Sequence, residues 1–304
     1  MQTMQPRREL AAERARSEAP PCAGRRGSVL VEFALVSLAF YLILAGTLEV
    51  GRMITSAQIV QNAARVAARE LALLPLPATM SFQDALRCDR VRERVYDPRK
   101  LAVPLPSGVL PDTSDWPTVN RILLPLMVVG EVNGTQYLHY PGALVQTFVG
   151  NEVVVKVPQV VARGADGVES IRWVDVLEEV VPTGTDPGRG PFSLASTGPE
   201  RGLVAIRVHY PYQAATLTAF QPVDVTDPNP VAEPILADDA GVTQVNAAGG
   251  VLLGGSGSDA GPYSGQYGLG KFYALNREVR PFRRLISSQA VFRREVFHAG
   301  TSCP

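Results

Sequence analysis

The sequence has no excess of charge of either sign. Its 304 residues include 29 lysines and arginines and 29 aspartates and glutamates, so the formal net charge is zero. No segment forms a basic domain of the kind that binds the phosphates of a nucleic acid. We therefore expect no nucleic acid partner, and the net charge does not point to any other kind of partner.

Residues suited to metal binding or catalysis are also scarce. The three histidines, His139, His209 and His298, are far apart and have no second histidine, cysteine or carboxylate at ligand spacing. His209 lies in an alternating pattern and is expected to be a half-buried strand residue. The glycines between 249 and 270 are not followed by a helix that carries Lys and Ser or Thr, as a phosphate-binding loop would be. We expect no enzyme, catalytic residue, cofactor or metal site.

Only one long apolar run is present, from Val29 to Leu48. At about 1.5 Å per helical residue it spans roughly 30 Å, enough to cross the hydrocarbon core of a bilayer. It is longer than the roughly 7–15 apolar residues of a secretory signal peptide. Strong helix formers follow it, with no proline before Pro75. The pattern predicts a transmembrane helix that continues unbroken into a stalk.

The residues before this run indicate its orientation. Residues 1–27 contain six arginines, and two of them, Arg25 and Arg26, lie next to the run. By the positive-inside rule, this end of the chain stays in the cytoplasm. We therefore expect a single-pass protein of a bacterial cell membrane, in contact with membrane lipid, whose residues after Leu74 lie outside the cytoplasm.

Glu32 lies in the first turn of the apolar run and requires an explanation. A carboxylate in lipid costs at least a few kcal/mol on insertion scales unless it is paired or reaches water. One interpretation is that Glu32 reaches the lipid headgroups from one turn inside the span. The other is that the chain is cut after Gly27, so that Ser28 carries a new terminal amine. In a bundle of such chains, Glu32 of one copy could then neutralise the amine of its neighbour.

Four motifs carry a resemblance to a known family. They are Arg26-Gly-Ser, Val31-Glu-Phe-Ala-Leu, Glu49-Val-Gly-Arg and the run Gln61-Asn-Ala-Ala-Arg-Val-Ala-Ala-Arg. Together they resemble the N-terminal helix of the TadE-like family of tight-adherence (Flp) pilus assembly proteins. The strand pattern that runs into Pro211-Tyr212 is similar to a closing strand in that family.

The resemblance implies a pseudopilin-like protein that is matured by a prepilin peptidase. Gly27 and Ser28 would flank the cleaved bond, and Glu32, followed by Phe33, would be the carboxylate used in recognition and assembly. The implied partners are the prepilin peptidase, other pilins or pseudopilins, and the pilus assembly machine. No role for Glu49 or Arg52 follows, although residues three apart on a helix can form an ion pair.

The predicted stalk is amphipathic. Its polar face contains Gln58, Asn62, Arg65 and Arg69. The apolar positions at helical spacing are Val50, Met53, Ile54, Ala57, Ala64, Ala68 and Leu71. Alanine permits close approach of another backbone, which could belong to a sister helix or to the chain's own outer domain.

The outer region predicts an α+β fold, a long N-terminal helix followed by a strand-rich domain with a late helix. Strands are expected at 121–129, 152–161, 171–180 and 203–210, and helices at 83–96 and 282–297. Residues 221–270 are rich in Pro, Asp, Gly and Ser and predict a long loop or insert. The expected organisation is 1–27 leader, 28–74 helix and stalk, 75–220 strand-rich domain, 221–270 insert and 271–304 C-terminal segment.

The three cysteines fit this topology. Cys22 would be removed with the leader, which leaves Cys88 and Cys303 on the oxidising side of the membrane. We predict a disulfide that tethers the C-terminal segment to the start of the outer domain. The alternative is two unrelated thiols.

Two functional classes remain open. The first is a structural role in pilus assembly, which requires Gly27 and Glu32. The second is an uncleaved single-pass protein whose outer domain binds a ligand or partner, or contains an enzyme without a recognisable motif. This second class requires only that the span be apolar.

Overall fold

A computed structural model describes residues 26–106, 109–132, 135–147, 152–163, 169–182, 190–196, 198–219, 250–253, 272–274, 277–300 and 303. The chain divides into two compact units, Met1–Thr47 and Leu48–Pro304. The predicted leader lies almost wholly outside the described residues, and so does Cys22. Most of the predicted insert at 221–270 does as well, apart from the strand β10 (Gly250–Leu253).

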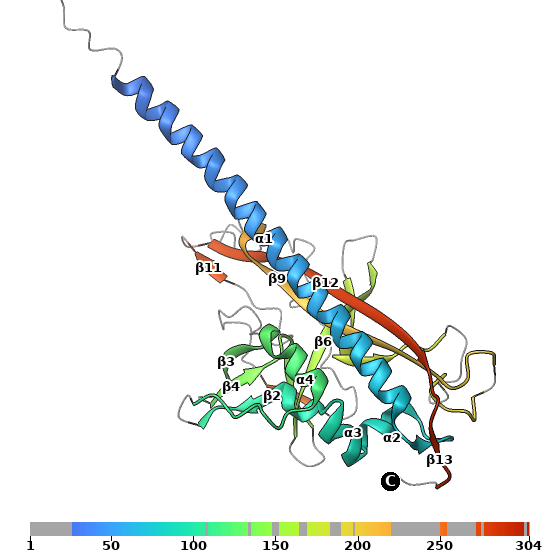
Figure 1. Ribbon diagram of the computed structural model, residues 1–304. Coiled ribbons are helices and arrows are strands. Elements are labelled where there is room, and N and C mark those ends of the chain that lie inside the picture. Colours follow the sequence, from blue (N-terminus) through green and yellow to red (C-terminus); the bar gives the residue numbers. More distant parts are fainter. Residues whose placement is uncertain are drawn as a thin grey trace, which may run out of the picture. The chain divides into compact units, whose positions relative to one another are not determined.

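The first helix, α1, spans Arg26–Leu73. By length and composition, its segment Val29–Leu73 is the one helix among the described residues that could cross a membrane. In the first unit its large apolar side chains are exposed, with Leu30 71% and Phe40 68% accessible. The predicted unbroken helix is confirmed, and it ends two residues before Pro75 (Figure 1).

The second unit is built mainly from antiparallel sheets. One sheet has the order β11-β12-β9-β8, a second β10-β5-β6-β7 and a third β2-β4-β3, while β1 and β13 form a short parallel pair. The strands of the first sheet are β8 (Leu177–Glu179), β9 (Leu203–Ala219), β11 (Phe272–Ala274) and β12 (Arg277–Arg293). The second adds β5 (Ala143–Thr147), β6 (Val153–Arg163) and β7 (Glu169–Asp175) to β10. The remaining strands are β1 (Leu76–Pro77), β2 (Ala102–Pro104), β3 (Val128–Val132), β4 (Thr135–His139) and β13 (Phe297–His298).

Short helices lie between β1 and β3 in the chain. They are α2 (Phe82–Arg87), α3 (Asp89–Arg94), η2 (Pro98–Leu101), α4 (Thr118–Leu123) and η4 (Leu124–Leu126). A long helix followed by sheets and a few short helices confirms the α+β class. The predicted strands at 152–161 and 203–210 are confirmed as β6 and β9, and the one at 171–180 is divided between β7 and β8. The predicted helix 83–96 is interrupted at Cys88, whose extended backbone separates α2 from α3.

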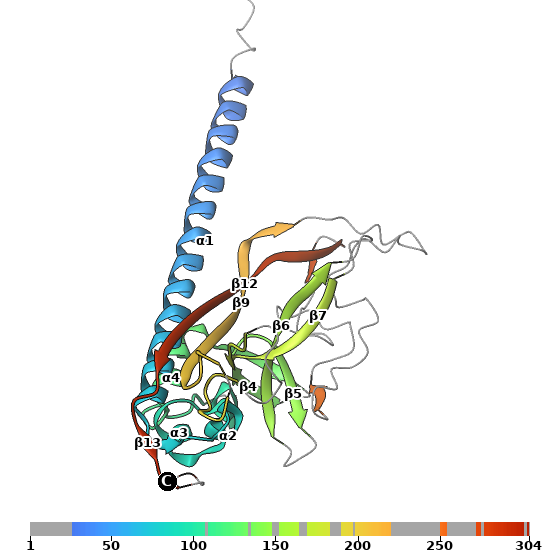
Figure 2. The same ribbon diagram turned by 90° about the vertical axis from the view of Figure 1, so that its right-hand side faces the viewer.

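From Leu48 onward, α1 lies along the sheet formed by β9 and β12 (Figures 1 and 2). Its fully buried residues are Val60, Ala63, Ala64, Ala67, Ala68 and Leu71, and they share one core with the β9 residues Val204, Ile206 and Val208. The alanine-rich face therefore packs on the chain's own domain. The predicted polar face is exposed, as expected. The predicted apolar stripe fails at its start, because Val50 and Ile54 are half exposed.

The strand predicted at 121–129 is wrong over most of its length. The segment forms α4 and η4, and only its last two residues belong to β3. A short continuous apolar run does not distinguish a buried strand from a buried helix. The helix is fixed by a long-range contact, because the buried Asn120 side chain accepts from Asp97 N and donates to Asp97 O, both at 2.9 Å.

The helix predicted at 282–297 is also wrong. Its residues up to Arg293 belong to β12, and Phe297 begins β13. Strand β12 pairs with β9 from Arg280↔Ala219 to Arg293↔Leu203, with one irregularity after Pro281. A long partner strand supplies hydrogen-bond partners for the backbone groups of β12 that face it, and this tertiary pairing outweighs local helix propensity. The charged residues that suggested an amphipathic helix include Arg284 and Arg293, which are exposed on the strand.

Candidate functional site

The residues of the predicted cleavage and assembly site lie at the start of α1. Gly27 and Ser28 are in its first turn, since the helix begins at Arg26. Glu32 is exposed, and the neighbouring Phe33 is 69% exposed. Within the part of the chain that the structure describes, Glu32 has no hydrogen bond or ion pair. The helix thus carries a carboxylate and a large apolar ring, both accessible, about one turn after Gly27.

The second acidic residue of α1, Glu49, has a different environment. It is 4% exposed and lies at the start of the second unit. The Tyr212 hydroxyl on β9 is 2.6 Å from Glu49 Oε2 and 3.1 Å from the Glu49 carbonyl oxygen. Arg52 Nη1 lies 3.5 Å from Glu49 Oε1, so the predicted ion pair is present. Glu49 therefore anchors α1 to β9 immediately after the apolar run.

Two tyrosines of β9 share the face that contacts α1. Tyr210 is 9% exposed and Tyr212 3% exposed. Burial raises the pKa of Tyr212 to about 12, and its hydrogen bond to the Glu49 carboxylate acts in the same direction. Burial also raises the pKa of Tyr210, although a hydrogen bond with Ser56 partly offsets this. Both phenols thus keep their protons more strongly than a tyrosine in water does.

Replacing Tyr212 with Phe should lower the free energy of unfolding by about 1.5–3 kcal/mol, because a buried hydrogen bond to a carboxylate is lost. The folded-state pKa lies above the ordinary value of 10.0. The stabilisation from the protonated phenol is therefore complete below pH 10 and is lost as the pH rises to about 12. Urea unfolding of wild type and Tyr212→Phe at pH 7 to 11.5 tests this.

The difference in stability between the two proteins should shrink at the alkaline end of that series. Tyr137→Phe serves as the control, since Tyr137 is a partly buried tyrosine of β4 whose hydroxyl has no hydrogen bond among the described residues. A constant difference across the whole pH range would contradict the assignment of Tyr212 as the donor to Glu49.

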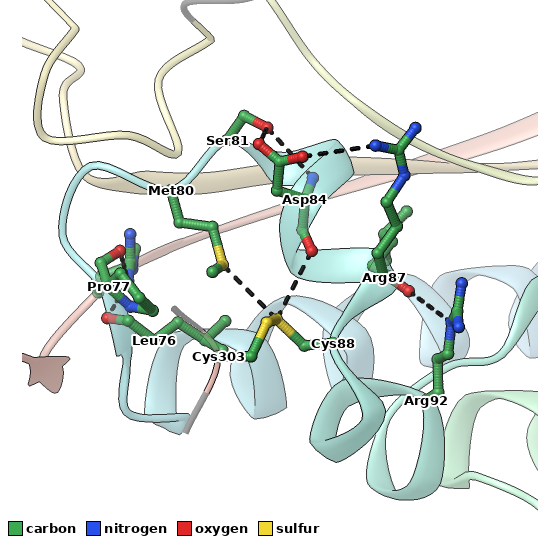
Figure 3. Close-up of a disulfide and its surroundings, with 11 residues drawn as sticks. Leu76, Pro77, Met80, Ser81, Asp84, Arg87, Cys88, Arg92 and Cys303 are labelled. Atoms are coloured by element: carbon green, nitrogen blue, oxygen red, sulfur yellow. Dashed lines mark hydrogen bonds and ion pairs between the residues drawn. A yellow bond between two sulfur atoms is a disulfide. The ribbon is translucent and has the colours of Figure 1, made fainter. Parts of the chain in front are cut away.

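The structure contains a disulfide between Cys88 and Cys303, the two cysteines that the sequence prediction paired (Figure 3). Their Cα atoms are 5.7 Å apart across 215 residues of sequence. Cys88 lies between α2 and α3 and is 2% exposed, whereas Cys303 is exposed. The sulfur of Met80 lies 3.7 Å from the Cys88 sulfur. The bond tethers the C-terminal segment to the first short helices of the outer domain.

His209 is fully buried, so its prediction as a half-buried residue is wrong. It lies on β9, between β8 and β12, and both neighbouring strands contribute a partner. His209 Nδ1 is 2.8 Å from Ser287 Oγ, and Nε2 is 2.9 Å from Glu178 Oε1. Both ring nitrogens are satisfied, which explains how the sheet accommodates a buried imidazole. Among the described residues, no group of three His, Cys, Asp or Glu side chains could hold a metal ion.

Sequence reasoning missed the role of Glu49 and the partners of His209. Tyr212 is 163 residues from Glu49, and Ser287 is 78 residues from His209. A single sequence carries no signal for pairs at such separations. The pattern at Pro211-Tyr212 predicts a closing strand, but only the sheet places the tyrosine of that strand against α1.

Comparisons with known proteins found a similarity for one segment of the chain, which lies in α1. No curated protein and no solved structure matches the chain. A family model described as TadE-like protein matches residues 27–69. This range begins at Gly27, includes Glu32, Glu49 and Arg52, and ends within the buried part of α1. The predicted resemblance is thereby confirmed: residues 27–69 of this chain are similar to the TadE-like family.

Proposed function

We propose that this chain is a non-enzymatic pseudopilin or minor pilus component that acts in the assembly of a tight-adherence pilus. The observation that carries the proposal is the TadE-like match over residues 27–69. The matched segment coincides with most of α1, a helix long and apolar enough to cross a membrane. The proposal therefore assigns the assembly function to α1. It places the outer domain of the same chain outside the cytoplasm.

In this proposal, residues 1–27 remain in the cytoplasm until a prepilin peptidase cuts between Gly27 and Ser28. The first turn of α1 then carries the new amine of Ser28, and Glu32 lies one turn further along the helix. A carboxylate exposed to lipid is costly unless it finds a cationic partner. Glu32 would gain that partner from the amine of a neighbouring pilin or pseudopilin in the assembly machine.

The buried half of α1 limits where such assembly contacts can form. The alanine-rich face from Val60 to Leu71 is already occupied by β9 and β12 of the same chain. Neighbouring helices would therefore contact the apolar residues before Glu49, which include Phe33 and Phe40. Both are more than 60% exposed.

Processing is tested first by the intact mass and N-terminal sequence of the protein from its native membrane. A chain that begins at Ser28 is expected. Gly27→Leu should abolish this maturation, because the peptidase must accommodate the side chain next to the cut bond. Gly24→Leu, another leader glycine change, should mature normally. A wild-type chain that keeps residues 1–27 would contradict prepilin-type processing and favour an uncleaved, single-pass protein with a ligand-binding outer domain.

A further inference from the structure

The C-terminal segment contacts the strand β1, which follows α1, through the buried side chain of Arg294. Arg294 directly follows β12 and is 3% exposed. Its guanidinium donates to the carbonyl oxygens of Leu76 at 2.7 Å, Pro77 at 3.0 Å and Phe192 at 3.1 Å. One side chain thus joins three segments: the C-terminal segment, the strand β1 after α1, and the loop that contains Phe192.

The environment of Arg294 is unusual for a cation. Its guanidinium carbon lies 4.5 Å from the ring centre of Phe192 and 5.0 Å from that of Phe297. No carboxylate pairs with it among the described residues, and burial lowers its pKa to about 10. Burying a cation is costly unless its surroundings satisfy it. Here carbonyl oxygens accept from both terminal nitrogens and two aromatic faces lie against the guanidinium, while Nε has no hydrogen-bond partner among the described residues. These groups are in place only when all three segments have come together.

Backbone contacts reinforce the same junction. Phe297 and His298 of β13 pair in parallel with Leu76 and Pro77 of β1. Glu295 N donates to Ala72 O, in the last turn of α1, at 3.3 Å. Figure 2 shows β13 at the same end of the second unit as α2 and α3. We call the Arg294 contacts and the β1–β13 pair the C-terminal clasp.

We propose that the C-terminal clasp forms before the disulfide and positions Cys303 against Cys88, with Cys303 as the thiol that meets an external oxidant and Cys88 as the thiol that completes the bond. Arg294 is then a positioning residue for an oxidation site. The clasp acts through Phe297 and His298, which pair with β1. His298 lies only five residues before Cys303. This inference does not depend on the role in pilus assembly.

The asymmetry between the two cysteines supports this order. Cys303 is exposed, whereas Cys88 is 2% exposed, with its sulfur between Met80 Sδ and Asp84 O (Figure 3). A buried thiol reacts slowly with a bulky oxidant, because the attacking thiolate must reach the oxidant's sulfur. An external disulfide compound is therefore expected to react first at Cys303.

The chemistry needs only an oxidant that contains a disulfide. The Cys303 thiolate attacks one sulfur of that disulfide, which forms a mixed disulfide and releases one thiolate of the oxidant. The Cys88 thiolate then attacks the Cys303 sulfur and displaces the second thiolate. Two electrons pass to the oxidant, which ends as two thiols once it has taken up the two protons lost by the cysteines.

The first experiment measures the rate of disulfide closure. The full chain carrying Cys22→Ser is reduced, mixed with glutathione disulfide and sampled by mass spectrometry after alkylation of free thiols. Arg294→Ala should slow the attack of Cys88 on the mixed disulfide at Cys303 about tenfold or more. The reason is that the effective concentration of the Cys303 sulfur near Cys88 falls when the clasp is weakened. Arg293→Ala changes the adjacent, exposed arginine and should close at the wild-type rate. Equal rates for all three proteins would overturn the role of the clasp.

The second experiment tests which thiol reacts first and does not require Arg294 to be changed. In the Cys22→Ser background, Cys88→Ser should accumulate one glutathione on Cys303. Cys303→Ser should react at least tenfold more slowly, because its remaining thiol is buried. If Cys303→Ser takes up glutathione as fast as Cys88→Ser, the proposed order of oxidation is wrong. This comparison remains decisive even if Arg294→Ala does not fold.

Discussion

Leu71→Ala is expected to lower the free energy of unfolding of the outer domain by about 2–5 kcal/mol. Leu71 is fully buried in the last turns of α1, and its neighbours on the same face are alanines. Small neighbours cannot extend into the space that a shortened side chain leaves. The cost should therefore include the lost burial of apolar surface and the cavity that remains, because the surrounding helix and sheet relax only in part.

Leu73→Ala provides a matched control on the same helix. Leu73 is 45% exposed, and its truncation should change the free energy of unfolding by no more than about 0.5 kcal/mol. Denaturant unfolding of the detergent-solubilised full chain, followed by circular dichroism, measures both values. Similar losses for the two variants would contradict the orientation of α1 on β9.

Glu32→Ala is expected to leave membrane insertion unchanged or improved while reducing assembly with other pilins at least tenfold. Removing a carboxylate from the first turn of the span eliminates a cost of a few kcal/mol on insertion scales. The same change would remove the proposed partner of the Ser28 amine in a neighbouring chain. Insertion can be followed by carbonate extraction of membranes, and assembly by co-purification of crosslinked pilus components.

Ser37→Ala is the control for this experiment, because it alters a polar side chain of the same apolar run without removing a charge. It should assemble as the wild-type protein does. A Glu32→Ala protein that fails to insert would show that the carboxylate acts in membrane entry. A variant that inserts and assembles normally would remove Glu32 from the proposed mechanism.

The parts of the fold that could be predicted from sequence depend on local pattern. The helix α1 was predictable because its apolar run, helix formers and terminal proline all lie within one continuous segment. The strand β6 was predictable because it is rich in valine and has turn-forming glycines before and after it in the sequence. In both cases the signal lies among residues adjacent in the sequence.

The failures have a common physical cause. Residues 121–129 are apolar enough for a strand, but most of them form helices instead. The first of these helices contains Asn120, whose buried side-chain amide forms hydrogen bonds with the backbone of Asp97. Residues 282–297 have the spacing of an amphipathic helix. The long strand β9, however, supplies backbone hydrogen-bond partners that no local pattern predicts. Both outcomes are decided by segments far away in the sequence.

The candidate site divides in the same way. Gly27, Ser28, Glu32 and Phe33 were recognisable because their spacing along one segment carries the family resemblance. The anchor at Glu49 was not, since its function depends on Tyr212. The pairing of Cys88 with Cys303 could be predicted because only two cysteines remain beyond the predicted leader.

The disulfide has a consequence for limited proteolysis of the chain. It closes a covalent ring that begins at Cys88, shortly after α1, and ends at Cys303. A single backbone cut anywhere between these two residues leaves two fragments that remain joined through sulfur. The distal fragment therefore stays attached to the part of the chain that contains α1. For cuts inside the ring, only a second cut or reduction of the bond would release any part of the outer domain.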